Sequence, residues 1–296
     1  MIAAVGGESL LARSLRGLVA SPKASIALVV CVVLFAAAVL APLIAPQNPY
    51  DLLEIDFFDA RLPPGSEGTT GLTYWLGTDT QGRDMFSAML YGLRTSLAVG
   101  FTAGALALAV GTTLGLLAAY LGGRIDALLM RFVDLMLGFP TILVALMILV
   151  VFGQGTWKVI LALVFVQWAY FARAVRGMAL VESNKDYVDA ARCLGLSSAR
   201  IVFRHILPNC LPPLIVIGTI QVASAIAAEA TLSFLGIGLP ITEPSLGLLI
   251  ANGYQVLLAG LYWMSVYPGL LLLVLVFSIN VVGDRLRAVL NPRLVD

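Results

Sequence analysis

Six long apolar runs constrain the fold of this chain more than any other feature. A helix needs roughly 20 largely apolar residues to cross a hydrocarbon layer about 30 Å thick. Only 12% of the residues are charged, which is about half the share of an ordinary soluble domain. The runs cover residues 26–45, 96–120, 135–152, 159–181, 213–235 and 262–282. The chain is therefore predicted to be an all-α membrane protein with six transmembrane helices.

The first run follows basic residues, as the core of a secretory signal would. Its apolar part exceeds the roughly 7–15 residues of a signal core, and five more runs follow it. We therefore expect an uncleaved first helix.

The Lys and Arg residues predict the orientation of the chain. All 18 except Arg61, Arg83, Arg94 and Lys158 lie in or near segments that six spans would place on one side. Basic segments favour the cytoplasmic side, so both termini are predicted to be cytoplasmic. The predicted division is a cytoplasmic segment 1–25, a first helix 26–45, an external loop 46–94, a five-helix core 95–283 with a cytoplasmic loop 182–210, and a cytoplasmic tail 284–296.

Charge and cysteine spacing exclude several classes of site. A formal net charge of +1 argues against a nucleic-acid partner. Cys31, Cys193 and Cys210 have neither a CxxC nor a paired spacing, so neither a metal site nor a disulfide framework is expected. The cysteines are expected to act as small apolar packing residues.

The loop 182–210 has the pattern of two short helices. Residues 184–194 predict a helix that ends at Gly195, because glycine adopts the left-handed terminating conformation at little cost. Ser197 or Ser198 is positioned to begin a second helix, and Pro208 is expected to end it. Small side chains at Ala190 and Ala191 would let another protein approach the backbone closely. The alternatives are a solvated basic loop and a DNA-binding helix-turn-helix, which tethering at both ends disfavours.

Four glycines lie on one face of the second span, and we expect them to permit close helix contacts. Either packing within this chain or an interface with a second membrane subunit would use that face; the residues are Gly100, Gly104, Gly111 and Gly115. In the fifth span, Glu229 is a costly intramembrane carboxylate. A structural role in hydrogen bonding or ion pairing is favoured over a proton relay or cargo contact.

Two prolines and one acidic residue complete the predicted spans. Pro140 and Pro268 fall inside spans three and six, where they are expected to bend the helices. Asp134 lies three residues after Arg131, so a local ion pair on one helix is expected.

In the external loop, a short polar motif is expected to provide structural anchors. Glycines would form turns, aspartates would accept backbone amides, and arginine would pair with a carboxylate. The residues are Gly77, Thr78, Asp79, Gly82, Arg83 and Asp84.

Ordered motifs along the chain resemble those of a known family. The motifs are Leu76-Gly77-Thr78-Asp79-Thr80-Gln81-Gly82-Arg83-Asp84, Tyr91-Gly92-Leu93-Arg94-Thr95-Ser96-Leu97, Tyr120-Leu121-Gly122-Gly123, Met130-Arg131-Phe132-Val133-Asp134, Asp189-Ala190-Ala191 with Gly195 and His205-Ile206-Leu207-Pro208-Asn209, Ala228-Glu229-Ala230-Thr231-Leu232-Ser233-Phe234-Leu235-Gly236, and Gly283-Asp284-Arg285-Leu286-Arg287 with Leu290-Asn291-Pro292. In this respect the chain resembles the inner-membrane permease subunits of binding-protein-dependent ABC importers, in the dipeptide, oligopeptide and nickel branch, and most closely the C-type dipeptide permease subunits. Asp189 replaces the usual Glu, and Ala88 stands where relatives often carry Arg.

The resemblance implies a type I ABC importer permease fold and a half-share of a translocation pathway for dipeptides or short oligopeptides. It also implies that a coupling helix contacts an ATPase; the residues implied are Asp189, Ala190, Ala191, Gly195, His205, Leu207 and Pro208. The implied partners are a second homologous permease, two cytoplasmic ABC ATPases, an external solute-binding protein and membrane lipid. The implied location is the inner membrane of a prokaryote.

No GxxxxGK[ST] phosphate loop occurs in the chain, so it is not expected to be an enzyme. No cofactor is expected in this chain, and ATP and Mg are expected on the ATPase subunits. Nickel chelates, glutathione and peptide antibiotics are alternative cargoes. An ion-coupled secondary transporter is the alternative from another class, but the chain has neither a convincing repeat nor acidic residues at one depth.

Overall fold

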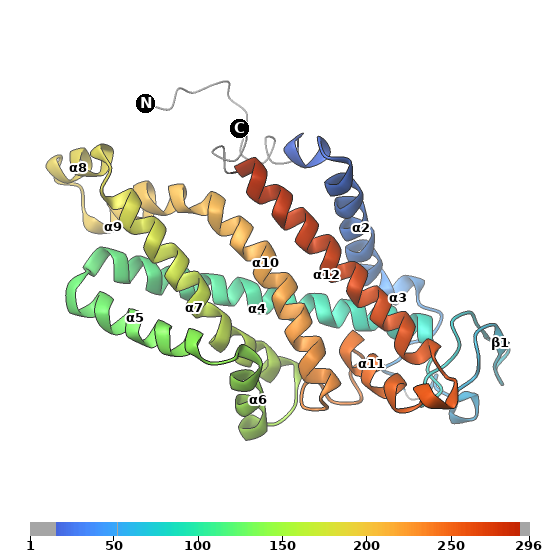
Figure 1. Ribbon diagram of the computed structural model, residues 1–296. Coiled ribbons are helices and arrows are strands. Elements are labelled where there is room, and N and C mark those ends of the chain that lie inside the picture. The colour runs from blue at the N-terminus through green and yellow to red at the C-terminus, as the bar shows by residue number, and fades with distance from the viewer. Residues whose placement is uncertain (1–15, 52, 291–296) are drawn as a thin grey trace.

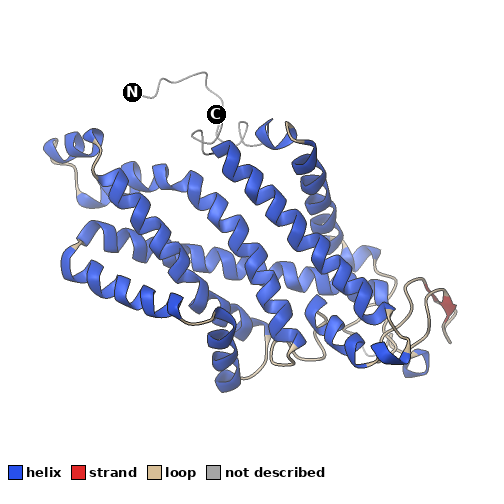
Figure 2. Ribbon diagram, in the orientation of Figure 1, coloured by secondary structure: helices blue, strands red, loops and turns tan. Residues whose placement is uncertain are grey.

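The computed structural model describes residues 16–51 and 53–290 of the chain, and these are mostly helical (Figures 1 and 2). Residues 1–15 of the predicted N-terminal segment and residues 291–296 of the predicted tail lie outside the described residues. The long elements are α2 (Pro22–Val39), α4 (Met85–Leu121), α5 (Gly123–Gly138), α6 (Thr141–Phe152), α7 (Thr156–Ser183), α10 (Leu207–Phe234) and α12 (Trp263–Leu290). The short helices are α3 (Ala41–Ile44), α8 (Asp186–Cys193), α9 (Ser198–Ile201) and α11 (Leu246–Gln255). Smaller elements are the 3-10 turns η1 (Phe57–Asp59) and η3 (Leu257–Ala259), the π-helical segment η2 (Val202–Ile206), and the strands β1 (Ser66–Glu67) and β2 (Thr73–Tyr74).

Five helices in the described part of the chain are long and apolar enough to cross a membrane. They are α2, α4, α7, the continuous helix Ser198–Phe234 and α12. A sixth span is obtained if α5 and α6 are counted together, although they meet at a bend of 91°.

The third predicted span, residues 135–152, is broken rather than bent. Phe139 is extended, with φ −93° and ψ 144°, as expected for a residue before proline. Pro140 precedes the first residue of α6 instead of lying inside a helix. Because proline lacks an N–H and clashes with the preceding turn, α5 ends at Gly138 and a new helix begins at Thr141.

The second span begins at Met85, inside the segment predicted to be external loop. The side chain of Asp84 accepts a hydrogen bond from Ser87 N at 2.8 Å and so caps the helix. The helix therefore begins about three turns before the apolar run, which starts at Ser96.

The fifth span begins earlier than predicted, because Pro208 does not end the second loop helix. The chain passes from α9 through η2 into α10 without a break. Leu207 N bonds to Val202 O, which is the wider π spacing. Pro208 therefore occupies the first turn of α10, where its missing N–H is tolerated.

Helix α4 packs against α7, α10 and α12, which lie across it in Figure 1. The four glycines of α4 allow this close packing within the chain. A Cβ at Gly100 would meet the side chain of Ile226 on α10, and a Cβ at Gly104 would meet that of Val222. A Cβ at Gly111 or Gly115 would overlap the backbone of α7 at Trp168 or Ala172.

Replacing Gly111 with alanine is therefore expected to destabilise the bundle by about 1–3 kcal/mol, the usual cost of overpacking. Gly218 is the matched control, because it lies within α10 and a Cβ there would meet nothing within 4 Å. Thermal unfolding of the purified protein in detergent measures both. A Gly111→Ala protein that melts with the Gly218→Ala protein would contradict the packing argument.

The described residues between 45 and 84 form a compact loop at the end of α4 that begins at Met85. β1 and β2 pair in antiparallel register, Ser66 with Tyr74 and Glu67 with Thr73. The Tyr74 hydroxyl donates to Asp59 at 2.9 Å. Burial is the main cause that raises the pKa of Tyr74, and the hydrogen bond to the Asp59 carboxylate raises it further.

Candidate functional site

Helix α8 projects from the end of the molecule where α7 ends and α9 begins (Figure 1). Gly195 ends it with φ +71°, as the sequence predicts. Leu196 N bonds to Ala191 O at 3.2 Å and Gly195 N to Arg192 O at 2.9 Å. This pair of bonds is the Schellman arrangement, which gives α8 a defined end and direction.

The exposed side of α8 carries Asp189 and Ala190. Asp189 accepts a hydrogen bond from Arg192 at 2.9 Å, and both side chains are exposed. Ala191 was expected to lie on an open docking surface. It is instead 5% exposed and packs into the apolar cluster beneath α8. The helical period places it on the same side as Val188, so the open surface is narrower than the sequence suggested.

The base of α8 is joined to α7 and α10 by Tyr187. Its hydroxyl donates to the Glu182 carboxylate and accepts a bond from Asn209 Nδ2 at 3.1 Å. Asn209 also bonds to His205 O at 2.7 Å, and Lys185 lies 2.6 Å from Glu182. Burial and the neighbouring carboxylate raise the pKa of Tyr187 to about 12, so the hydroxyl stays protonated at neutral pH. Tyr187 was not predicted from the sequence.

The remaining predicted coupling residues follow α8 in the chain. His205 lies in η2 and Leu207 begins α10, and both are partly buried. Pro208 is exposed in the first turn of α10. The structure thus gathers these residues at one end of the molecule, while their roles in coupling stay predictions.

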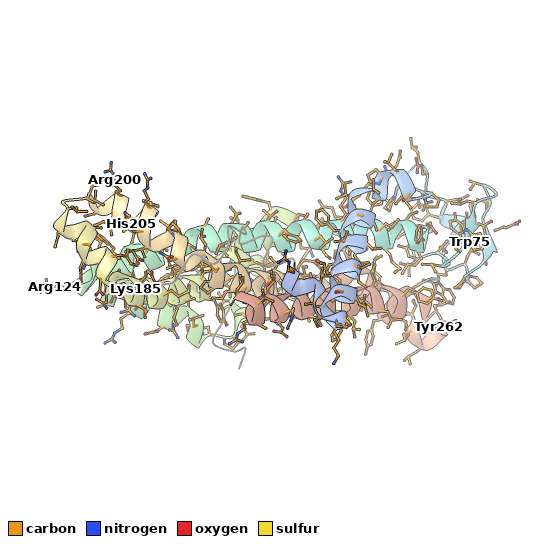
Figure 3. All side chains as sticks on the ribbon, turned by 90° about the horizontal axis from the view of Figure 1, so that it is seen from above. Trp75, Arg124, Lys185, Arg200, His205 and Tyr262 are labelled. Atoms are coloured by element: carbon orange, nitrogen blue, oxygen red, sulfur yellow. The ribbon has the colours of Figure 1, made fainter. Side chains whose placement is uncertain are left out.

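The two ends of the molecule differ in chemistry. Figure 3 separates a basic end, carrying Arg124, Lys185, Arg200 and His205, from an opposite end carrying Trp75 and Tyr262. The predicted external motif lies at the opposite end, in the compact loop and the start of α4.

At the centre of the motif is a buried ion pair. Arg83 Nε donates to Asp79 Oδ2 at 2.6 Å, and both side chains are at most 3% exposed. Asp79 Oδ1 accepts from Gln81 N at 2.8 Å and from Arg83 N at 3.0 Å. Gly82 has φ +84°, which lets the chain turn back and place the arginine beside its partner.

Neighbouring motif residues connect this turn to the rest of the loop and to α12. Thr78 Oγ1 donates to Asp59 O at 2.6 Å, and Trp263 Nε1 donates to Thr78 O at 3.2 Å. A Cβ at Gly77, which has φ +78°, would overlap Leu62 O and the Trp263 ring. The motif therefore packs inward, as structural anchors would.

Asp84 connects the motif to the segment that follows α3 and to the first turn of α4. Its backbone N donates to Gln47 Oε1 at 2.6 Å, and its carboxylate accepts from Ser87 N and Oγ. Burial raises the pKa of Asp84, and the bonds from Ser87 oppose that shift.

Glu229 is fully buried between α4 and α10. Ser96 Oγ donates to Glu229 Oε2 at 2.8 Å, and Ser233 Oγ donates to Oε1 at 2.8 Å. Among the described residues it forms no ion pair. These contacts favour the hydrogen-bonding form of the structural role.

The local Arg131–Asp134 pair expected from the sequence is not formed. Asp134 instead pairs with Arg173 on α7. One further pair, Asp126 with Arg176, also joins α5 to α7. The reason is that α7 packs along α5 and presents its arginines to that helix.

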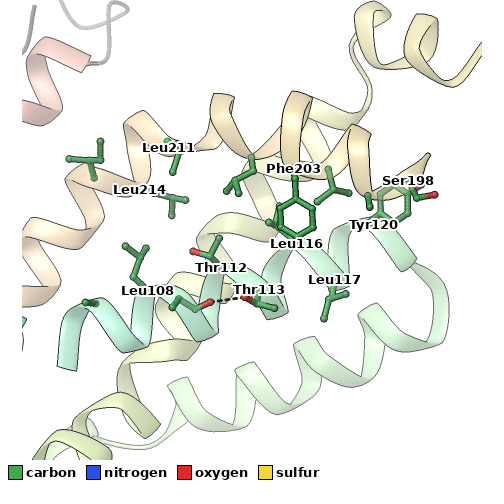
Figure 4. A pocket seen from close by; sticks show the side chains of 16 residues that line it. Leu108, Thr112, Thr113, Leu116, Leu117, Tyr120, Ser198, Phe203, Leu211 and Leu214 are labelled. Carbon is green, nitrogen blue, oxygen red and sulfur yellow. Dashed lines mark hydrogen bonds between the residues drawn. The ribbon is translucent and has the colours of Figure 1, made fainter. Parts of the chain in front are cut away.

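An apolar groove of about 570 Å³ lies between α4 and the helix that begins at Ser198 (Figure 4). Leu116, Phe203 and Leu214 are among its lining side chains. Charged side chains do not occur among the described residues that line it. Nor do any three His, Cys, Asp or Glu side chains cluster as metal ligands in the described part of the chain.

Comparison with known proteins places the chain in a family. Residues 111–296 match the model of the binding-protein-dependent transport system inner membrane component, and residues 9–64 match that of the N-terminal TM domain of oligopeptide transport permease C. A putative peptide transport system permease protein from Brucella suis is 41% identical over 290 residues, covering 97% of this chain and 94% of the relative. The dipeptide transport system permease protein DppC of Escherichia coli is 40% identical over 272 residues, covering 92% and 89%.

A solved structure of the MetNI methionine ABC transporter in an inward-facing conformation has a similar fold. The TM-score is 0.56 with 24% sequence identity, covering 69% of this chain and 97% of that chain. Together, the family matches and this likeness confirm the predicted type I importer permease fold. The chain therefore belongs to the family of binding-protein-dependent transport system inner membrane components.

Proposed function

We propose that this chain forms half of the translocation pathway of an ATP-driven importer of dipeptides or short oligopeptides. The cargo class rests on the relatives, which are named as dipeptide and oligopeptide permeases. The observation that carries the coupling role is α8, a short helix with a fixed end projecting from the basic end of the bundle. We place that end, and with it both termini, in the cytoplasm of a prokaryote, because basic residues favour that side.

The proposed assembly contains a second homologous permease, two ABC ATPases that bind ATP and Mg, and a solute-binding protein at the external side. ATPase closure would push on α8, whose contacts through Tyr187 reach both α7 and α10. A stiff element of this kind moves as a body and passes the displacement to the spans. The permease itself performs no chemistry on the cargo.

Uptake of a labelled dipeptide tests this function. The gene for this chain is deleted in cells that lack other peptide importers, and it is then restored by complementation. Loss of uptake that complementation restores supports the proposal. Unchanged uptake would mean that the cargo is not a dipeptide, and nickel chelates, glutathione or peptide antibiotics would be the cargoes to test.

Tyr187 provides a test of how α8 is held. Tyr187→Phe keeps the ring but removes the hydroxyl that contacts Glu182 and Asn209. The loss is expected to weaken the anchoring of α8 by about 0.5–1.5 kcal/mol and to lower peptide uptake per ATP hydrolysed. Tyr254→Phe is the matched control, because Tyr254 lies on α11 with an exposed side chain. Equal uptake per ATP in both variants would show that the Tyr187 hydroxyl has no part in coupling.

A further inference from the structure

A groove of about 810 Å³ lies between α4, α5, α6 and α7, where α6 turns away from α5 (Figure 1). We call it the Lys158 groove, because Lys158 is the one charged residue among the described residues that line it. The other lining side chains are valine, leucine, isoleucine, phenylalanine and tryptophan, and they come from all four helices. The groove is therefore amphipathic, with a single cation and a long apolar wall.

The size of the lining residues distinguishes this groove from a surface that receives another helix. Contacts between transmembrane helices are enriched in glycine, alanine, serine and threonine, which let two backbones approach closely. None of these residue types occurs among the described residues that line the Lys158 groove. By contrast, alanine, serine and threonine form part of the groove between α4 and the helix that begins at Ser198. The Lys158 groove therefore suits a flexible hydrocarbon chain better than a partner helix.

Lys158 lies at the end of α7 that is opposite α8. It belongs to the first turn of α7, whereas α8 follows the last turn. The 28 residues of α7 rise about 42 Å, which exceeds the roughly 30 Å of a hydrocarbon layer. Trp157 beside Lys158 is 58% exposed, and tryptophan is enriched where the membrane meets water. The ammonium of Lys158 therefore lies within reach of the lipid headgroups.

The charge of Lys158 has no acidic partner in the described part of the chain. Its side chain is exposed and forms no ion pair with a described residue. Glu243, which reaches the same turn, instead accepts a hydrogen bond from Thr156 Oγ1. Lys158 Nζ lies beside the turn between α6 and α7, because a Cβ at Gly153 would be 3.4 Å from it. The cation is thus positioned at the interfacial end of the groove and is available to an anion.

We propose that the Lys158 groove binds an anionic phospholipid, with one acyl chain along the groove and the headgroup phosphate against Lys158 Nζ. The chain occupies space that the side chains of four helices leave open, and it contacts both halves of the broken span α5–α6. An anionic headgroup is favoured over a zwitterionic one, because the cation of a zwitterionic headgroup opposes the lysine. The site depends on no cargo, and only the assignment of the lipid to the external leaflet rests on the proposed function.

The test labels the complete complex, with its partner subunits, with photoreactive lipids. Phosphatidylglycerol is anionic and phosphatidylcholine is zwitterionic, and both carry the same diazirine at the same position of one acyl chain. After irradiation in mixed micelles, mass spectrometry measures the labelled fraction of the peptides that contain Phe132 and Phe152, which line the groove. Phosphatidylglycerol is expected to label these peptides more strongly than phosphatidylcholine does.

Lys158→Gln is expected to lower the labelling by phosphatidylglycerol about 5-fold, the effect of one lysine near an anionic lipid surface. Lys158→Arg, which keeps the charge, should retain most of the labelling. Lys23→Gln is the matched control, because Lys23 is also an exposed lysine in the first turn of an apolar helix, α2, and lies outside the groove. The labelling of the groove peptides should be unchanged in that variant.

Leu161→Trp tests the place of the acyl chain. Leu161 is 48% exposed and lines the groove, so a larger side chain there fills the groove without entering the core. Labelling of the Phe132 and Phe152 peptides by both lipids is expected to fall.

Unchanged labelling by phosphatidylglycerol in Lys158→Gln would overturn the proposal, since the headgroup would then make no contact with Lys158. An absence of label from both lipids in the unmodified complex would also overturn it and mean that a partner subunit covers the groove. None of these measurements uses a cargo. Loss of lipid labelling and loss of dipeptide uptake are therefore separate failures.

Discussion

Replacing Arg83 with alanine is expected to lower the free energy of unfolding by about 3–5 kcal/mol, the usual cost of breaking a buried ion pair. The substitution leaves the Asp79 carboxylate buried with only the backbone donors of Gln81 and Arg83. Because the same turn leads into Asp84 and the start of α4, the compact loop and the first turns of α4 should loosen together. Thermal unfolding in detergent and limited proteolysis of residues 45–84 measure the two effects.

Arg94→Ala is the matched control for that experiment. Arg94 also lies on α4, but its side chain is exposed, so its removal is expected to change stability by no more than about 0.5 kcal/mol. If the Arg83→Ala and Arg94→Ala proteins melt together, the buried pair does not hold the loop.

Replacing Gly195 with valine is expected to lower the peptide uptake per ATP hydrolysed several-fold, while the complex still assembles. Gly195 has φ +71°, and a Cβ there would meet nothing within 4 Å. The penalty therefore comes from the backbone conformation alone, at about 1–2 kcal/mol or more for a β-branched residue. Release of this turn frees the end of α8 and changes its direction relative to α9.

Gly195→Asn separates conformation from side-chain chemistry, because asparagine tolerates the left-handed region. Uptake and ATP hydrolysis are measured in the same proteoliposomes for the unmodified protein, the Val variant and the Asn variant. The Asn variant should retain most of the coupling that the Val variant loses. Normal coupling in Gly195→Val would contradict the assignment of α8 as the coupling helix.

The spans were predictable because each repeats one simple signal over about 20 residues. The same applies to the left-handed Gly195, where a short amphipathic run meets a glycine. A pairing of Arg83 with a carboxylate was also expected from the residue types, and the structure identifies Asp79 as the partner. In each of these cases the deciding interactions are local in sequence.

The differences arise where a distant segment decides the outcome. Pro140 breaks the predicted span through its own local sterics, but the 91° angle between α5 and α6 accompanies the packing of α6 on α7 and α10, which no local pattern reports. Asp134 pairs with Arg173 because α7 packs along α5, although Arg131 is nearer in sequence. Helix α11 was missed because its ten residues are too few for a span and follow a loop rich in glycine and proline.

The side chains whose contacts were missed are single polar residues within apolar or mixed helices. Lys158 was noted only as a basic residue apart from the others, and the groove beside it is visible only when α4, α5, α6 and α7 are placed together. The Tyr187 hydroxyl contacts Asn209 on another helix, and this contact is visible only when the two helices are placed together. A basic residue on the side of the membrane that basic residues avoid was the available signal for Lys158.

Reconstitution of the complex in proteoliposomes distinguishes an ATP-driven importer from a secondary transporter. Accumulation of a labelled dipeptide is measured with the binding protein outside, and with either ATP inside or an imposed proton or sodium gradient and no ATP. Accumulation is expected to require ATP, both ATPases and this chain, and an ion gradient is not expected to replace ATP. Accumulation driven by an ion gradient in liposomes that contain this chain alone would contradict it and establish a secondary transporter.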